Sequence, residues 1–203
     1  MGATPESVNI VPATAETIRQ AAQLVAAGEL VIIPTETVYG VAARGDSPEA
    51  LARLCMAKER QEKKKLALLA ADLEAIRAAG ARVDAVVEQL AAAFWPGPLT
   101  LVLPTAAGEW VGYRVPDHPV ALAWLRELDF LPAVTSANRS GEPAALTAAD
   151  AWRALSPHVA LALDAGVATG GRASTVVKVA DGKLEILRAG PISSEALERA
   201  AAD

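Results

Sequence analysis

The segment ELVIIPTETVYG, residues 29–40, places a short apolar run directly before a polar loop. The run LVII is typical of a buried strand, and Pro34 ends it because proline has no backbone N–H for a neighbouring strand. The loop PTETVYG then sets hydroxyls and one carboxylate just beyond the strand end. Ligands of open α/β sheets bind in crevices at such ends, whereas a capped turn would explain only one of these polar side chains. The segment therefore predicts a buried strand that carries a binding loop.

Helical and strand patterns alternate on both sides of this segment, which indicates an α/β fold with a mixed sheet. We expect helices after Thr14, Ser47, Asp72, Thr147 and Ser193, and over residues 82–94 and 119–128. We expect strands at 29–34, 66–70, 99–103, 111–116, 131–135, 159–164, 174–179 and 183–188, the last two joined by the hairpin signal Asp181-Gly182. No linker interrupts the pattern, so we expect a single domain over residues 1–203, with its core at about 10–195.

Composition limits where the protein acts and what it binds. A single cysteine, Cys55, excludes an internal disulfide and fits a reducing compartment, so we expect a cytoplasmic protein. No apolar run reaches the roughly 18 residues of a membrane-spanning helix, and we see no signal peptide. The net charge of −5 offers no general attraction for nucleic acid, so any anion site has to be local.

Several common catalytic motifs do not occur in the sequence. It contains neither the phosphate-binding G-x-x-x-x-G-K-[ST] nor the dinucleotide-binding G-x-G-x-x-G. It also lacks H-E-x-x-H and the nucleophile elbow G-x-S-x-G. A zinc enzyme and a Ser-His-Asp hydrolase are therefore poor interpretations.

The basic run KERQEKKK, residues 58–65, lies between a predicted helix and a predicted strand. One interpretation is a solvated helix end, where cations complement the helix dipole. The other is an anion clamp, because arginine binds phosphate through two N–H groups and lysine binds it as a point charge. The sequence pattern of this run leaves both open.

Further polar groups follow other predicted strands. TSANRSG, residues 135–141, offers hydroxyl, amide and backbone donors to an anion or a ribose, although the pattern is also that of a tight turn. Ser174 follows the glycine-bearing stretch GVATGGRA, and Arg114 and Arg188 each lie near the end of a strand. Either arginine alone is explained equally well by a surface ion pair.

Taken in order, seven stretches resemble the YrdC-like family, whose members make threonylcarbamoyl-adenylate. They are PTETVYG, the K-x-R of residues 58–60, PGPLTLVL, VGYRVPDHP, TSANRSGEP, ASTVVKV and ILRAGPIS. The resemblance implies a single domain of the short form, with a twisted mixed sheet flanked by helices around a positively charged cavity. It implies synthesis of threonylcarbamoyl-AMP and pyrophosphate from L-threonine, bicarbonate and ATP with Mg²⁺. Downstream proteins would then transfer the group to tRNA.

The resemblance also assigns site residues, none of them a metal ligand. The residues expected to act in catalysis are Lys58, Arg60 and Arg114. Those expected at ATP are Lys58, Arg60, Glu62, Ser136, Asn138, Ala144 and Arg188, with Trp110 nearby. Those expected at threonine are Thr35, Ala67, Arg114, Val134 and Ser174, with Arg114 on the carboxylate.

Three positions depart from the family pattern: Glu59 replaces the usual glycine, and Gln61 and Lys65 stand where the family usually has residues that stiffen the loop. We expect retained activity with weaker ATP binding. The chemistry needs no protein nucleophile, because a carbamate oxygen of the substrate attacks the α-phosphorus, so a missing triad is no objection. The alternatives are an RNA-binding module, with direct RNA contact, and a weakened homologue of the same fold.

Overall fold

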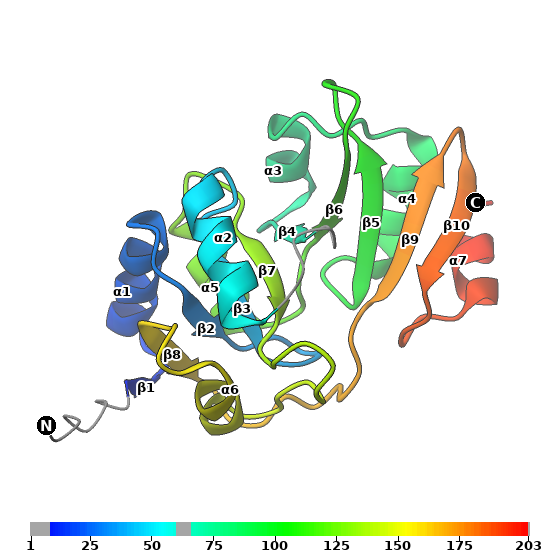
Figure 1. Cartoon of the computed structure of the whole chain (residues 1–203). Helices are drawn as coiled ribbons and strands as arrows, with labels where there is room; N and C mark the ends of the chain where they lie inside the picture. Colours follow the sequence, from blue (N-terminus) through cyan, green and yellow to red (C-terminus); the bar gives the residue numbers. More distant parts are fainter. Residues whose placement is uncertain (1–8, 60–65, 203) are drawn as a thin grey trace, which may run out of the picture.

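The computed structural model describes residues 9–59 and 66–202, and within them ten strands form one twisted sheet (Figure 1). The strands are β1 (Ile10–Pro12), β2 (Val31–Ile33), β3 (Gly40–Ala43), β4 (Ala67–Leu69), β5 (Leu99–Pro104), β6 (Trp110–Arg114), β7 (Ala133–Ser136), β8 (Leu161–Asp164), β9 (Thr175–Ala180) and β10 (Lys183–Arg188). The helices are α1 (Ala15–Ala26), α2 (Pro48–Ala57), α3 (Leu73–Ala78), α4 (Ala85–Phe94), α5 (Pro119–Arg126), α6 (Ala148–Leu155) and α7 (Ser194–Ala200). The spatial order β1-β8-β2-β3-β7-β4-β6-β5-β9-β10 mixes parallel and antiparallel pairs, as the sequence predicts.

The segment of residues 29–40 lies inside this sheet, where β2 and β3 are the third and fourth of the ten described strands. All three residues of β2 are buried, and β2 pairs with β8 in parallel and with β3 in antiparallel orientation. The polar loop of residues 34–39 therefore turns the chain from β2 straight into β3. A buried strand followed by a polar loop is confirmed as the local structure, and the binding role of the loop stays a prediction.

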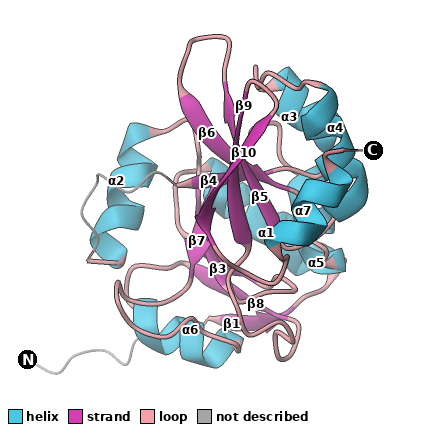
Figure 2. Ribbon diagram, turned by 90° about the vertical axis from the view of Figure 1, so that its right-hand side faces the viewer, coloured by secondary structure: helices cyan, strands magenta, loops and turns pink. Residues whose placement is uncertain are grey.

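Helices cover the two halves of the sheet differently. Figure 2 shows α2 and α6 on one face, and the other five described helices on the opposite face. α2 and α6 pack on the half around β2 and β3, where Tyr39, Leu54 and Trp152 share one apolar cluster. α3, α4 and α7 pack behind β5, β6 and β9 around Leu101, Tyr113 and Val177. The front face of this second half is thus left open.

The alternation of side chains shows what lines the open face. Along β5, Leu99, Leu101 and Leu103 belong to the rear core, whereas Thr100 and Val102 line a cavity in front. Successive residues of a strand point to opposite faces, which explains the pattern. The second half of the sheet is accordingly the floor of a cavity.

All the predicted helices and strands form, with small differences at their ends. α4 begins at Ala85, capped by the Asp84 side chain, and not at residue 82. The hairpin at Asp181-Gly182 is confirmed, with both residues at positive φ as such turns require. Strands β1 and β3 were not predicted, because β1 is short and β3 consists of glycine, valine and alanine without a β-branched run. Within the described residues, no helix has the length and apolar character that crossing a membrane requires.

Candidate functional site

A cavity of about 320 Å³ lies on the open face of β4, β5, β6 and β9. The β2–β3 hairpin and the residues around Ser136 enclose it on one side, and the start of β9 and the end of β10 enclose it on the other. Its described lining consists of Thr35, Thr37, Val38, Gly40, Leu66, Ala67, Leu69, Thr100, Val102, Trp110, Gly112, Arg114, Val134, Thr135, Ser136, Ala173, Ser174, Val176, Leu187 and Arg188. Two clusters of polar side chains face each other within it. We call them the hairpin wall (Thr35, Thr37, Arg114) and the β10 wall (Thr100, Ser174, Arg188).

The hairpin wall rests on a tightly bonded loop. The Thr35 hydroxyl donates to the carbonyl of Val38 at 2.6 Å and accepts from two backbone N–H groups of the same loop at 3.3 Å. Its oxygen also lies 2.8 Å from the Thr37 hydroxyl. Since a hydroxyl has one hydrogen to donate, these bonds commit the Thr35 hydroxyl to the loop itself. The polar loop is therefore preorganised, and a ligand would meet Thr35 through its methyl group or backbone.

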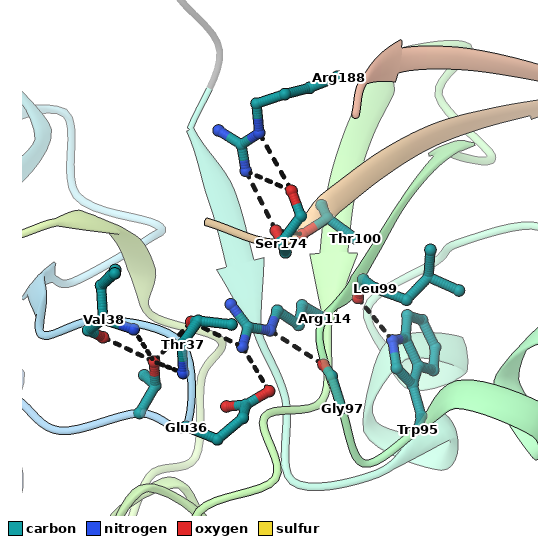
Figure 3. A network of polar contacts seen from close by, with 11 residues as sticks. Glu36, Thr37, Val38, Trp95, Gly97, Leu99, Thr100, Arg114, Ser174 and Arg188 are labelled. Carbon is teal, nitrogen blue, oxygen red and sulfur yellow. Dashed lines mark hydrogen bonds and ion pairs between the residues drawn. The ribbon is translucent and has the colours of Figure 1, made fainter. Parts of the chain in front are cut away.

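Arg114 ends β6 and is 8% exposed. Its Nε donates to the Gly97 carbonyl at 3.1 Å, and its Nη2 donates to Thr37 Oγ1 at 3.0 Å and to Glu36 Oε1 at 2.6 Å (Figure 3). Glu36 and Arg114 thus form an ion pair across 78 residues of sequence. Arg114 is buried and charged, and its position is fixed by three separate oxygen atoms.

Arg188 is the corresponding cation of the β10 wall. Its Nε and Nη2 donate to the Ser174 carbonyl at 3.1 and 2.9 Å, and Nη2 also donates to Ser174 Oγ at 3.1 Å. The Ser174 and Thr100 hydroxyls are joined at 2.8 Å. A β-bulge between Ile186 and Arg188 shifts the register of β10 here, and such bulges re-aim side chains at sites. The result is a guanidinium held on neutral oxygens at the cavity rim.

The electrostatics of the cavity favour anions. Burial lowers the pKa of Arg188, and the positive charge of Arg114 lowers that pKa further, although arginine stays protonated. No aspartate or glutamate belongs to the described lining. An anion between the two guanidiniums would relieve their repulsion. The arrangement suits a ligand with two separate anionic groups.

Lys58 lies at the C-terminal end of α2 and is only 3% exposed. Its ammonium donates to the backbone carbonyls of Ser136 and Asn138, the latter at 2.7 Å, and lies 3.4 Å from Asn138 Oδ1. It therefore fastens the loop after β7 and does not line the cavity in the described arrangement. The phosphate contact that the resemblance assigns to Lys58 stays a prediction. Arg60 and Glu62, with the departures Gln61 and Lys65, lie outside the described residues.

Most of the other predicted residues meet in this cavity. Those in its lining are Thr35, Ala67, Trp110, Arg114, Val134, Ser136, Ser174 and Arg188. Asn138 and Ala144 instead line a second hollow, of about 600 Å³, formed by the loop after β7 and by α6. The Asn138 amide donates to the carbonyls of Arg139 and Glu142 at 2.8 Å, so it stabilises that loop. Their predicted contacts with ATP stay predictions.

Two residues of the site carried no assigned role in the sequence reasoning. Thr37 belongs to the quoted polar loop, but its bond to Arg114 joins segments far apart in the chain. Thr100 lies inside the apolar strand LTLVL, where it is the one polar residue. That single polar residue was the only sign in the sequence that the strand contributes to a site. A threonine is so well suited to strands that the signal is weak. Among the described residues, no group of three His, Cys, Asp or Glu side chains is placed to hold a metal.

A mixed α/β domain with an arginine-lined cavity on the open face of its sheet is the class that this geometry defines. Residues 23–190 match the protein family described as telomere recombination (Sua5/YciO/YrdC), and the chain belongs to that family. The threonylcarbamoyl-AMP synthase of Bacillus subtilis (strain 168) is 37% identical over 191 residues, which cover 89% of this chain and 55% of that protein. The chain therefore spans about half the length of that relative.

Two further relatives extend the comparison. The threonylcarbamoyl-AMP synthase of Chromohalobacter salexigens is 34% identical over 179 residues, covering 84% of this chain and 96% of that protein. The crystal structure of Pyrococcus abyssi Sua5 complexed with L-threonine superimposes with a TM-score of 0.87 at 31% identity. That match covers 95% of this chain and 59% of the Pyrococcus chain. The predicted family and fold class are thus confirmed.

Proposed function

We propose that this protein is a threonylcarbamoyl-AMP synthase of the cytoplasm, a nucleotidyltransferase that joins L-threonine, bicarbonate and ATP. Relatives of the same family carry that name, and the structure of Pyrococcus abyssi Sua5, to which this chain is similar, is a complex with L-threonine. The observation that carries the proposal is the pair of guanidiniums, Arg114 and Arg188, on facing walls of one cavity. One cation suits the carboxylate of an amino acid, and the other suits the phosphates of a nucleotide.

In this proposal the hairpin wall, the floor and Ser174 of the β10 wall bind threonine. Arg114 holds the carboxylate, with Thr35, Ala67, Val134 and Ser174 around the side chain and amine. Ser136, Asn138, Ala144 and Arg188 face ATP, with Trp110 nearby, and Lys58, Arg60 and Glu62 act near its phosphates. Lys58 would act there while it also holds the loop after β7. If the Lys58→Ala variant formed the adenylate at an undiminished rate, Lys58 would not hold the ATP phosphates.

The proposed reaction needs alignment more than it needs a reactive side chain. The threonine nitrogen attacks the carbon of bicarbonate, and loss of water leaves a carbamate. A carbamate oxygen then attacks the α-phosphorus, the bond to the β-phosphate oxygen breaks, and pyrophosphate leaves. Both reactants are anionic, so fixed cations that hold them together lower the barrier. Magnesium enters this proposal only with the ATP phosphates, and the product passes to proteins that modify tRNA.

Pyrophosphate release from the purified chain tests the proposal. We expect release that requires threonine, bicarbonate, Mg²⁺ and ATP together, and that stops when any one of them is omitted. Arg188→Ala should lose this release, whereas the surface variant Asp46→Asn should keep it. Salt-sensitive binding of RNA without turnover would favour the RNA-binding alternative. ATP hydrolysis that is indifferent to threonine would contradict the synthase.

A further inference from the structure

The guanidinium of Arg114 has only part of its hydrogen-bonding capacity left for a ligand. Arginine has five N–H donors, one on Nε and two on each terminal nitrogen. Gly97 takes the donor on Nε, and Glu36 and Thr37 take the two donors on Nη2. Among the described residues, Nη1 has no hydrogen-bond partner, and it lies on the side of the guanidinium that faces Ser174 (Figure 3). A carboxylate in the cavity therefore meets Arg114 through Nη1 alone.

Glu36 holds the guanidinium from behind. Its neighbours Thr35 and Thr37 line the cavity, but Glu36 does not. Its backbone is fixed as well, because Gly170 N–H donates to the Glu36 carbonyl at 2.9 Å. A Cβ added at Gly170 would stand 2.6 Å from that carbonyl oxygen, so only glycine permits this approach. The backbone contact between the Glu36 loop and the Gly170 loop thus fixes the place from which the Glu36 carboxylate reaches Arg114.

The arrangement is not one that stability alone would favour. The second oxygen of Glu36, Oε2, is buried and has no hydrogen-bond partner among the described residues. Nδ1 of His118 is also buried and unpartnered there, and the charge of Glu36 reaches His118. A buried polar atom without a partner costs free energy, and a buried ion pair often contributes little net stability. An unfavourable group kept directly behind a ligand-binding arginine indicates a role in binding.

We propose that Glu36 is the positioning residue of the amino-acid site: it locks Arg114 so that the substrate carboxylate is bound end-on through Nη1. The inference rests on the proposed function in one respect, namely that the ligand at Arg114 is an amino-acid carboxylate. Without Glu36, Nη2 regains a free donor and the guanidinium can turn. A carboxylate could then bind side-on, in a position that no longer directs the amine toward the nucleotide.

Binding of L-threonine by calorimetry, without ATP, and steady-state kinetics together test the proposal. We expect Glu36→Ala to raise the threonine Kd and KM by about 10-fold or more. Glu36→Gln keeps an acceptor but loses the charge, so we expect a smaller rise of about 3-fold. The KM for ATP should stay within about 2-fold in both, although the melting temperature should fall in both because buried Arg114 loses its charged partner. Asp46→Asn, which breaks a surface pair with Arg44, is the matched control and should leave every value unchanged.

The proposal is overturned if Glu36→Gln leaves the threonine Kd and KM at the wild-type values. It is also overturned if Glu36→Ala or Glu36→Gln raises the KM for ATP as much as that for threonine, since a general loss of structure would do this. Should Glu36→Ala fail to fold, the Gln variant decides alone. Wild-type protein that binds threonine but makes no pyrophosphate would refute the proposed function and leave this inference standing. Wild-type protein that does not bind threonine would refute both.

Discussion

The two walls of the cavity use the same side chain in different electrostatic settings. Arg114 and Arg188 each donate through Nε and Nη2, and each presents Nη1 without a partner among the described residues. The acceptors differ, because a carboxylate is among the partners of Arg114, whereas Arg188 donates only to the carbonyl and hydroxyl of Ser174. The charge of Arg114 is largely compensated and that of Arg188 is not. The hairpin wall therefore suits the single carboxylate of an amino acid, and Arg188 on the β10 wall suits a more highly charged phosphate.

The largest effect should come from removing the uncompensated charge. We expect Arg188→Ala to lower kcat/KM for ATP by about 100-fold or more, which corresponds to ~3 kcal/mol of transition-state stabilisation. The binding of threonine alone should weaken far less, because Arg188 reaches the threonine site only through its hydrogen bonds to Ser174. A threonine Kd that rises by as large a factor as kcat/KM for ATP falls would show that the two walls act as one site.

A smaller effect is expected on the hairpin wall. Arg114→Lys keeps a positive charge but cannot satisfy Gly97, Thr37 and Glu36 together, since lysine is a point charge without a planar fork. We expect the threonine KM to rise by about 10- to 50-fold, or ~1.4–2.3 kcal/mol, with the ATP KM nearly unchanged. Kinetics with one substrate varied at a time measure both. An equal rise in both constants would break the division between the walls.

Thr100→Val tests the contribution of a neutral hydroxyl to the β10 wall. Valine has nearly the shape of threonine but leaves the Ser174 hydroxyl without its 2.8 Å partner. A single neutral hydrogen bond is worth ~1 kcal/mol, so we expect a loss of about 3- to 10-fold in kcat/KM for ATP. Thr105→Val, in the connection between β5 and β6, is the comparison variant. A larger loss than that of Arg188→Ala would mean that the hydroxyls, and not the charge, dominate this wall.

The smallest effect concerns His118, behind the hairpin wall. Burial lowers the pKa of His118, and the charges of Glu36 and Asp117 oppose that shift only in part. The folded protein therefore binds this proton less readily than the unfolded chain, whose histidine pKa is about 6.5. The associated stability is complete above the unfolded pKa and is lost as the pH falls through it toward the lower folded pKa.

Melting temperatures at about pH 7.5 and about pH 5.5 measure this loss. We expect His118→Asn to show a smaller drop between the two pH values than wild-type protein does. His158→Asn is the matched control and should show the wild-type drop. A drop that is identical in the His118 variant would indicate that other groups account for the pH dependence.

The same contrast explains how much the sequence could predict. Local patterns give the strands and helices, and motif order identifies Thr35, Arg114, Ser174 and Arg188 as residues that the fold brings to one cavity. The bond from Glu36 to Arg114 joins positions 78 residues apart, so no local pattern carries it. Likewise, the basic run of residues 58–65 suggests that Lys58 binds an anion. Only the structure shows that its ammonium donates to the carbonyls of Ser136 and Asn138. Long-range partners decide which donors of a side chain remain for a ligand.

We propose that the two walls hold two different anionic substrates at once and that the chain joins them. Mass spectrometry of the product formed from ¹³C-bicarbonate, L-threonine and ATP tests it most directly. We predict an adduct of threonine and AMP that contains one labelled carbon, with one pyrophosphate released for each adduct. Pyrophosphate or AMP formed without a labelled threonine adduct would contradict the claim.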